Sequence, residues 1–186
     1  MCVFYRTCAK AAAARARRAY NADKNEERGF MDGDRPTYYS YFTPAGPITV
    51  AANGRAITRI ALGKAPLAGV CAPSELTNKA ATQMQEYLAG KRTSFSLPLS
   101  PCGTPFQQQV WNAVADIPYA QTATAADIAC RIGHAGAHRA VGAAARACPF
   151  AIAVPLHRLV RANGQPWGEG KPARVRGALL KLEQSR

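Results

Sequence analysis

The sequence predicts an α+β protein in which a small antiparallel sheet module precedes a helical domain. Strand-like runs with turn signals between them occupy the first half of the chain, and helix-forming runs occupy the second half. Two short helix-forming runs in the second half are joined across a glycine-containing turn, which is typical of a helix-turn-helix. The 186 residues are enough for an N-terminal extension at 1–36, an α+β module at 37–100 and a helical domain at 101–186.

The α+β module begins with a predicted antiparallel sheet. Residues 37–42 are rich in aromatic side chains and stop at the turn signal Pro44-Ala45-Gly46-Pro47. Residues 48–51 form a second strand-like run, and Asn53-Gly54 behind it is the strongest short signal for a β-hairpin. Residues 55–62 alternate polar and apolar side chains, so they predict the third strand.

One helix and one more strand complete the predicted module. Pro73-Ser74-Glu75 has the composition of a helix start, and Gly90 that of a helix end. Residues 94–99 are expected to form a short strand. Apolar side chains recur at helical spacing within the predicted helix, at Leu76, Ala80, Met84, Tyr87 and Leu88.

The second half begins with three predicted helices. Thr104-Pro105 starts the first one, which ends before Pro118. Thr124 is the expected cap of the second helix, which Gly133 ends, and residues 137–147 form the third. The second and third helices make up the predicted helix-turn-helix, although many helical hairpins bind nothing.

A strand, a loop and a final helix follow. The apolar run at residues 150–154 predicts a buried strand, and residues 164–170 predict a glycine-bearing loop. The last predicted helix ends with Glu183.

The charge balance favours a polyanionic partner. The chain carries 24 Lys and Arg against 11 Asp and Glu, a formal net charge of +13, and residues 101–186 hold 10 of the basic and 4 of the acidic side chains. Such a field attracts DNA or RNA, although a merely soluble basic protein has the same composition. No apolar run reaches the roughly 18 residues of a membrane span, so we expect no contact with a membrane.

Six cysteines are scattered without paired spacing, which predicts free thiols in a reducing, intracellular compartment such as the cytoplasm, nucleoid or nucleus. We expect no metal and no cofactor, because the three histidines lie far from the first cysteines. Residues 8–20 are rich in Ala and Arg, so the N-terminal extension is read as a flexible, solvated helix before a linker. An organelle transit peptide and a DNA-contacting arm remain alternatives for it.

The predicted helix at 137–147 has almost no bulky side chain except its arginines, Arg139 and Arg146. A helix this slim can lie against the narrow minor groove of DNA, and Arg139 is long enough to enter the base stack. A tightly packed core helix has the same composition, so the two interpretations are equally supported at this point.

Several motifs, in order and spacing, resemble the O6-alkylguanine-DNA alkyltransferases, the methylated-DNA–protein-cysteine methyltransferases. The resemblance runs from Thr37 to Glu183. Its most specific segments are residues 103–111 (GTPFQQQVW), 117–119 (IPY), 139–142 (RAVG), 154–160 (VPLHRLV) and 178–183 (ALLKLE). The resemblance implies a ribonuclease-H-like N-terminal module, a winged helix-turn-helix-like C-terminal domain and a monomer.

The resemblance also implies a chemistry. Members of the family bind the minor groove, flip the damaged guanine out and move its alkyl group onto a cysteine thiolate. His157 falls on the histidine that makes the thiolate and Glu183 on the glutamate that orients the histidine. The nucleophile position holds Leu156, whose side chain has neither a lone pair nor an ionisable proton. Alkyl transfer is therefore not expected.

The same comparison assigns the DNA contacts and the pocket. Arg139 falls on the arginine that fills the gap left by the flipped base, and the tyrosine that pushes on the flipped nucleotide's phosphate is replaced by Ala125. The asparagine near the reactive thiol is replaced by Cys148, and the tyrosine of the loop over the base by Glu169. These changes weaken base flipping as well as chemistry. The remaining candidates are Thr124, Arg146 and Arg158 for DNA, and Val154 and Pro155 for the pocket.

Three interpretations remain open. The first is a non-transferring homologue that binds duplex DNA and alkylated guanine, comparable to the alkyltransferase-like proteins, which flag lesions for a repair-pathway protein. The second is an active methyltransferase that uses a displaced thiol such as Cys148, although a small buried thiol is usually inert. The third is a variant of a parent that had cysteine at position 156; the further changes at Ala125, Cys148 and Glu169 favour natural drift over it.

Overall fold

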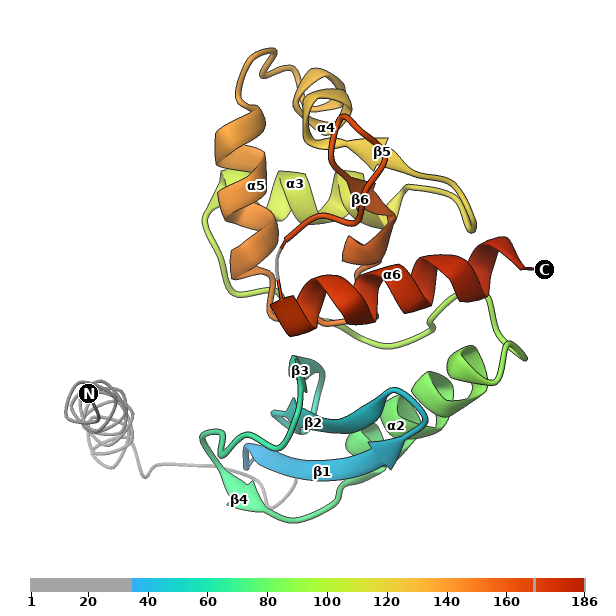
Figure 1. Ribbon diagram of the computed structural model, residues 1–186. Helices are drawn as coiled ribbons and strands as arrows, with labels where there is room; N and C mark the ends of the chain where they lie inside the picture. The colour runs from blue at the N-terminus through green and yellow to red at the C-terminus, as the bar shows by residue number, and fades with distance from the viewer. Residues whose placement is uncertain (1–34, 169, 186) are drawn as a thin grey trace, which may run out of the picture.

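The computed structural model describes residues 35–168 and 170–185, and it has the expected α+β architecture. The sheet module and the helical part lie against each other, with the last helix, α6 (Gly170–Gln184), running between them (Figure 1). The prediction for residues 1–36 falls almost entirely outside the described residues.

The sheet forms as the turn signals predict. Strands β1 (Thr37–Thr43) and β2 (Gly46–Ala52) pair antiparallel, and β3 (Ile57–Leu62) pairs antiparallel with β2. Gly54 in the predicted hairpin has a φ of +81°, a conformation that glycine adopts without strain. A short parallel strand that the sequence did not indicate, β4 (Val70–Cys71), completes the order β3-β2-β1-β4.

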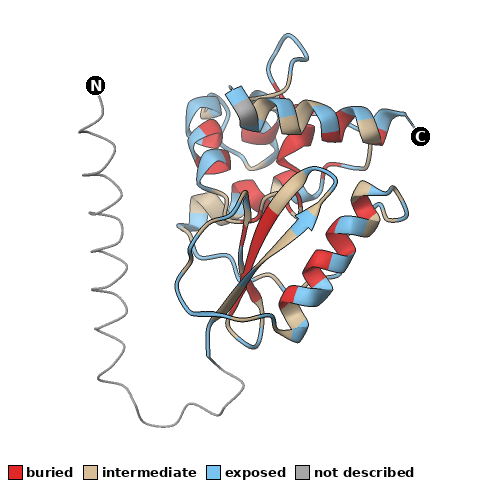
Figure 2. Ribbon diagram, turned by 60° about the horizontal axis from the view of Figure 1, so that its bottom comes forward, coloured by how far each residue is buried: buried red, intermediate tan, exposed pale blue. Residues whose placement is uncertain are grey.

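Helix α2 (Glu75–Leu88) packs against the sheet. It starts where predicted, because the Ser74 side chain caps it by accepting from the Thr77 N–H and the Thr77 side chain reciprocates. Residues 48–52 of β2 are buried throughout, as the red central strand of Figure 2 shows. Both faces of β2 are therefore covered, so this strand is the buried centre of a sheet whose other strands are partly exposed.

The outer edge of β3 holds the two halves together. The Ile57 N–H donates to the Pro98 carbonyl (2.7 Å), and the Ser100 N–H donates back to the Ile57 carbonyl (3.0 Å). Farther along, the Ile60 N–H donates to the Pro149 carbonyl (2.8 Å). The strand predicted at 94–99 is wrong: only Leu99 bridges to Ile57, because the proline at 98 has no N–H for a ladder.

The strand predicted at 150–154 is also wrong. Phe150 forms a single bridge with Ile60, and the chain then turns. The Val154 N–H donates to the Phe150 carbonyl (3.2 Å), and Ile152 has a φ of +69°. The apolar side chains are buried as expected, but the backbone bonds to itself locally instead of to a neighbouring strand.

The helical part contains the predicted helix-turn-helix. Helix α3 (Pro105–Ala115) is capped by Thr104, and α4 (Ala125–Arg131) is capped by Thr124. A turn with two positive-φ glycines, Gly133 and Gly136, leads into α5 (His138–Ala147). Strand β5 (Ala123–Thr124) pairs in parallel with β6 (Leu159–Val160). The chain that follows α5 therefore returns to the start of α4.

Candidate functional site

The candidate site is centred on a single 3₁₀ turn, η2 (Leu156–Arg158), that leads into β6. Leu156, His157 and Arg158 are 8%, 2% and 7% exposed. The turn closes because the Arg158 N–H donates to the Pro155 carbonyl (2.9 Å). Val154 and Pro155 are buried too, so the whole segment that the sequence singled out lies inside the molecule.

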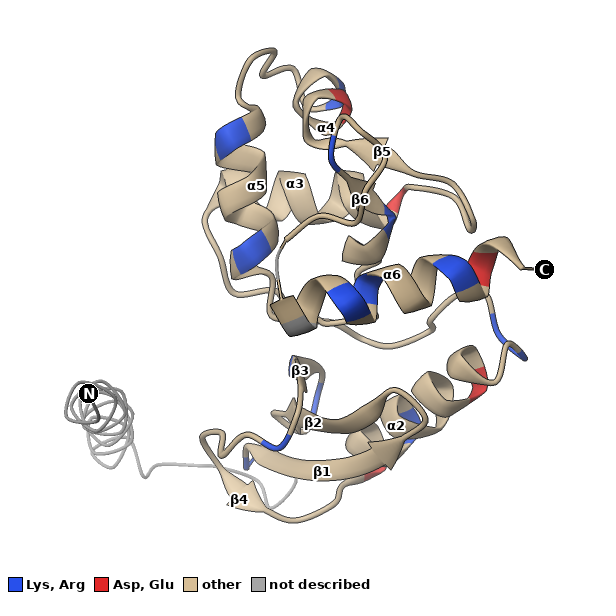
Figure 3. Ribbon diagram, viewed as in Figure 1, with Lys and Arg blue, Asp and Glu red and all other residues tan. Residues whose placement is uncertain are grey.

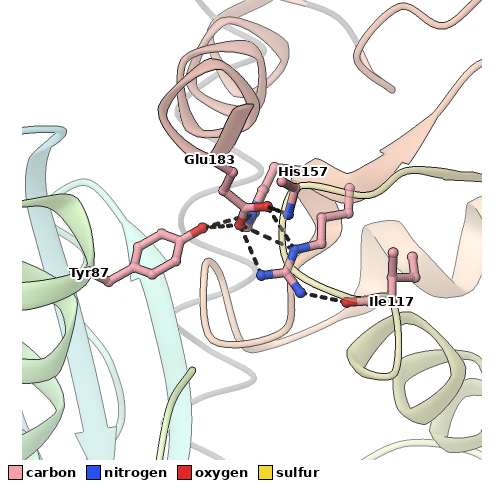
Figure 4. Close-up of polar contacts among 6 residues, drawn as sticks. Tyr87, Ile117, His157 and Glu183 are labelled. Carbon is pink, nitrogen blue, oxygen red and sulfur yellow. Dashed lines mark hydrogen bonds and ion pairs between the residues drawn. The ribbon is translucent and has the colours of Figure 1, made fainter. Parts of the chain in front are cut away.

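The carboxylate of Glu183, 1% exposed, accepts hydrogen bonds from several sides (Figure 4). His157 Nε2 lies 2.7 Å from Glu183 Oε1. The Ala120 N–H donates to Oε2 (2.8 Å), although Ala120 must adopt a φ of +60° to do so. Helix α6 therefore brings Glu183 to the histidine, and the pair that the sequence predicted is in contact.

Arg158 is buried beside this pair rather than displayed to a ligand. Its Nε and Nη2 donate to Glu183 (3.0 Å to Oε2 and 2.9 Å to Oε1), and its Nη1 donates to the Ile117 carbonyl (2.5 Å). Its guanidinium also lies 5.6 Å from the centre of the Tyr119 ring. Arg158, expected among the DNA contacts, is thus fully engaged inside the protein and neutralises Glu183.

A residue of the N-terminal module completes the cluster. The Tyr87 hydroxyl, on α2, donates to Glu183 Oε1 and lies 2.9 Å from His157 Nε2. Tyr87 is 1% exposed, so this contact is shielded from water. The sequence placed Tyr87 only on the apolar stripe of its helix. The sequence could have indicated this contact only through the tyrosine on an otherwise apolar stripe, because a buried tyrosine hydroxyl usually has a hydrogen-bond partner.

The network controls the charge of its members. Burial alone would raise the pKa of Glu183, but the hydrogen bonds from His157, Arg158, Tyr87 and the Ala120 N–H outweigh it and hold that pKa well below its usual range. Burial lowers the pKa of His157, against the opposing pull of Glu183. Burial also raises the pKa of Tyr87, and its bond to Glu183 acts in the same direction.

These directions describe an ionised Glu183 facing a neutral His157. A carboxylate acceptor at Nε2 keeps the proton on Nε2, so the lone pair of the imidazole is on Nδ1. Such a histidine can act as a general base. The preceding residue, Leu156, has a hydrocarbon side chain, so it offers the base no proton to remove.

Cys148 follows the last residue of α5 and is half-buried. Burial raises the pKa of its thiol to about 11, although a hydrogen bond from the Phe150 backbone and the charge of Arg176 act in the opposite direction. A thiol with such a pKa is protonated at neutral pH and is a poor nucleophile.

The predicted DNA-facing residues lie on α4 and α5. Arg139 and Arg146 are exposed and seven residues apart, so they share one face of α5, and Figure 3 shows the two basic positions along that helix. Ala125 is the half-exposed first residue of α4. The Thr124 hydroxyl accepts from the Asp127 N–H (3.2 Å) and donates to the Asp127 carboxylate (2.8 Å), so it acts as a helix cap.

The loop between β6 and α6 adds residues that the sequence reasoning missed. Trp167 lies against Gly142 of α5, where an added Cβ would be 3.4 Å from the indole ring. Arg161 donates to the Gly168 carbonyl (2.9 Å) and Arg176 to the Trp167 carbonyl (2.8 Å). Glu169, the expected loop residue over the base, lies outside the described residues.

Within residues 35–168 and 170–185, no group of three or more His, Cys, Asp or Glu side chains is placed to hold a metal ion. No described helix is both long enough and apolar enough to cross a membrane.

The fold and the site define a class of protein. It has a helix-turn-helix domain with basic residues on the second helix, α5, and a buried His–Glu pair beside that domain. Two family profiles match. Residues 37–101 match "6-O-methylguanine DNA methyltransferase, ribonuclease-like domain", and residues 105–185 match "6-O-methylguanine DNA methyltransferase, DNA binding domain".

Known proteins agree with the profiles. A methylated-DNA–protein-cysteine methyltransferase of Methanosarcina acetivorans is 39% identical over 154 residues, covering 80% of this chain and 99% of that protein. The solved structure of Mycobacterium tuberculosis O6-methylguanine methyltransferase has a TM-score of 0.75 and 37% identity, covering 81% of this chain and 94% of that one. The structure of the Mycobacterium tuberculosis OGT in complex with DNA has a TM-score of 0.73 and 38% identity, with coverage of 80% and 93%.

The chain belongs to the 6-O-methylguanine DNA methyltransferase family, a family of DNA alkylation-repair proteins. The expected family and fold class are thereby confirmed.

Proposed function

We propose that the protein binds the minor groove of duplex DNA, receives alkylated guanine in the pocket at η2, and does not transfer the alkyl group. The observation that carries the proposal is Leu156 beside an intact His157–Glu183 pair, with His157 Nε2 at 2.7 Å from Glu183 Oε1. The histidine–glutamate pair that would generate a thiolate is in contact, but the side chain at position 156 offers no atom to alkylate.

The exposed side of α5 supports binding to DNA. The residues of α5 that face solvent are small or basic, so the helix backbone can approach a narrow groove closely. These exposed residues are His138, Arg139, Ala140, Ala143, Arg146 and Ala147. The opposite side, with Val141, Ala144 and Ala145, is buried against α3 and α4. The small residues of α5 thus allow close packing on its buried side and close approach of DNA on its exposed side. The Mycobacterium tuberculosis OGT, which has a similar structure, is seen in complex with DNA.

Binding and its salt dependence test the first half of the proposal. We expect the affinity for a duplex to fall steeply when the salt concentration rises, because phosphate contacts release counterions. Arg139→Ala should weaken binding roughly tenfold or more, the cost of losing one inserted or base-reading arginine. Lys79→Ala, which removes the same charge from the exposed side of α2, is the matched control. Absent affinity, or affinity that ignores salt, would contradict binding.

Mass spectrometry after incubation with a duplex containing O6-methylguanine tests the second half. The wild-type chain should stay unmodified, whereas Leu156→Cys should gain one methyl group, because His157 and Glu183 are already in place. Leu156→Ala opens the same space without a thiol and should stay unmodified. A methyl group on the wild-type chain would overturn the proposal. An unmodified Leu156→Cys chain would count against lesion binding in the pocket.

A transferring enzyme that uses Cys148 is less well supported. The positive charge of Arg176 favours the thiolate, but burial still raises the thiol pKa to about 11. Peptide mapping of the same reaction distinguishes the two functions, because methylation of Cys148 would be found only in the second.

A further inference from the structure

Tyr87 belongs to the N-terminal module, yet its side chain ends beside two residues of the helical half (Figure 4). Its hydroxyl donates to Glu183 Oε1 and lies 2.9 Å from His157 Nε2. The ionised Glu183 has no proton to give, so the hydroxyl proton points to Glu183 and the hydroxyl oxygen faces the His157 N–H. That N–H also lies 2.7 Å from Glu183 Oε1, and it therefore has two oxygen acceptors, one from each half of the molecule.

The η2 turn depends on the same carboxylate for its conformation. The turn has three residues, and no side chain caps its start. Two of its side chains bond to Glu183 instead: His157 Nε2 lies 2.7 Å from Oε1, and Arg158 Nη2 donates to Oε1 (2.9 Å). Leu156 is the first residue of this turn. A group that fixes Glu183 and His157 therefore also fixes the backbone on which Leu156 lies.

The position of Tyr87 is set by the N-terminal module. Helix α2 is tied to β1 in its first turn, where the Tyr41 hydroxyl lies 2.8 Å from both the Thr77 hydroxyl and the Asn78 side-chain oxygen. The ring of Phe95 lies against the Tyr87 ring, with 5.1 Å between their centres. On its other neighbour, the imidazole of the site, the Tyr87 ring is centred 6.1 Å away. Tyr87 therefore cannot shift without moving the helix that carries it.

We propose that Tyr87 is a positioning residue of the candidate site, which fixes His157 and, through Glu183, the η2 turn that receives alkylated guanine. The inference rests on the proposed function and assigns the N-terminal module a part in it. Tyr87 is 1% exposed, so it touches neither DNA nor the lesion and acts through the two side chains that it contacts. Its loss should affect the discrimination between alkylated and unmodified guanine, and it should spare the contacts of α5 with DNA.

Fluorescence anisotropy with two duplexes of one sequence tests the inference. One duplex carries guanine and the other O6-methylguanine at the same position. We expect the wild-type chain to bind the methylated duplex more tightly. Tyr87→Phe should reduce this affinity ratio by roughly threefold to tenfold, up to the value of one hydrogen bond to a charged group. The affinity for the guanine duplex should stay unchanged.

Tyr41→Phe is the matched control. It also removes a tyrosine hydroxyl that bonds to α2, but at Thr77, ten residues before Tyr87 and about 15 Å away along the helix. It should leave the affinity ratio unchanged. Phe95→Leu keeps the Tyr87 hydroxyl and removes the ring that supports it, so it should lower the ratio by a smaller factor. This second variant keeps the test valid if Tyr87→Phe does not fold.

Methyl transfer by the Leu156→Cys chain reports the position of His157 independently of affinity. At saturating DNA, adding Tyr87→Phe should lower the rate constant of transfer roughly tenfold, a part of the roughly hundredfold or greater contribution of a well-placed general base. A mere loss of folded protein would lower the amount of methylated chain and leave the rate constant unchanged.

The outcomes separate the inference from the proposed function. A preference for the methylated duplex that survives Tyr87→Phe in full would overturn the inference and leave the proposed function intact. An equal loss of affinity for both duplexes, or an unchanged rate constant of transfer, would mean that Tyr87 supports only the fold, and it would overturn the inference too. Equal binding of the two duplexes by the wild-type chain would overturn the proposed lesion binding itself, and the inference with it.

Discussion

Arg158 and Arg176 both lie against aromatic rings in the helical half of the molecule, but their surroundings differ. Arg158 is 7% exposed and donates to Glu183 and to the Ile117 carbonyl, so its charge is matched and each of its three guanidinium nitrogens makes a hydrogen bond. Arg176 is half-buried beside Trp167 and Arg146 and has no carboxylate among its described partners. We call the first group the Glu183 cluster (Tyr87, His157, Arg158 and Glu183) and the second the Arg–Trp cavity (Arg146, Trp167 and Arg176).

The difference indicates two roles. A buried ion pair with every partner satisfied adds little net energy but is costly to break, which suits a group that must hold a fixed geometry. A cationic group without a counter-charge contributes little to folding and retains binding capacity for a ligand. The Glu183 cluster should therefore govern stability, whereas the Arg–Trp cavity should contribute little to it.

The largest expected effect follows the loss of the shared carboxylate. Glu183→Gln leaves the buried Arg158 charge uncompensated, so the free energy of unfolding should fall by about 3–5 kcal/mol. Urea denaturation followed by tryptophan fluorescence measures the change. Glu86→Gln breaks the exposed pair with Arg92 (2.8 Å) and should cost less than about 1 kcal/mol. Similar losses in the two variants would contradict the role assigned to the Glu183 cluster.

A smaller loss is expected from the contact between the two halves. Tyr87→Phe removes the hydroxyl that donates to Glu183 and leaves the ring in place, so the free energy of unfolding should fall by about 1–3 kcal/mol. The thermal midpoint and urea denaturation report this change. Tyr119→Phe is the control, since the Tyr119 hydroxyl makes no hydrogen bond to another residue within 35–168 and 170–185. An unchanged stability of Tyr87→Phe would mean that this hydrogen bond does not stabilise the contact between the two halves.

Acid should weaken the Glu183 cluster in two stages. The pKa values of His157 and Glu183 are both lowered by folding, so the unfolded chain takes up protons that the folded chain does not. Stability is complete above 6.5, the ordinary pKa of His157, falls below it, and falls more steeply below 4.5, the ordinary pKa of Glu183. Each proton contributes at most about 1.4 kcal/mol per pH unit.

The free energy of unfolding, measured by urea denaturation between pH 8 and pH 4, checks this dependence. His157→Gln should flatten the upper stage and leave the lower one. Stability that rises as the pH falls through 6.5 would mean that His157 is charged in the folded protein.

The smallest effect on stability belongs to the Arg–Trp cavity. Arg146 is exposed and lacks a carboxylate partner in the described structure, so Arg146→Gln should change the free energy of unfolding by no more than about 0.5 kcal/mol. Thermal unfolding without DNA measures this change. A large loss of stability would mean that the stack on Trp167 is structural, and the contrast between the two groups would fail.

Local patterns predicted most of the fold. The Asn53-Gly54 hairpin and the threonine caps at 104 and 124 depend on neighbours in the chain, and the structure has each of them. The strands predicted at 94–99 and 150–154 are absent, because a strand needs a partner edge. Apolar content alone does not distinguish a ladder from a buried turn such as the one at Ile152.

The sequence by itself determined the family and the fold class, since these depend on residue identity and spacing. It also brought His157 and Glu183 forward as a pair, through the resemblance. Only the tertiary structure joined Tyr87 to them, because that contact spans 96 residues. Only the tertiary structure shows that Arg158 is buried and that Arg146 and Arg176 both lie against the Trp167 ring. Burial and charge compensation are properties of the packed chain, so they separate arginines that the sequence leaves alike.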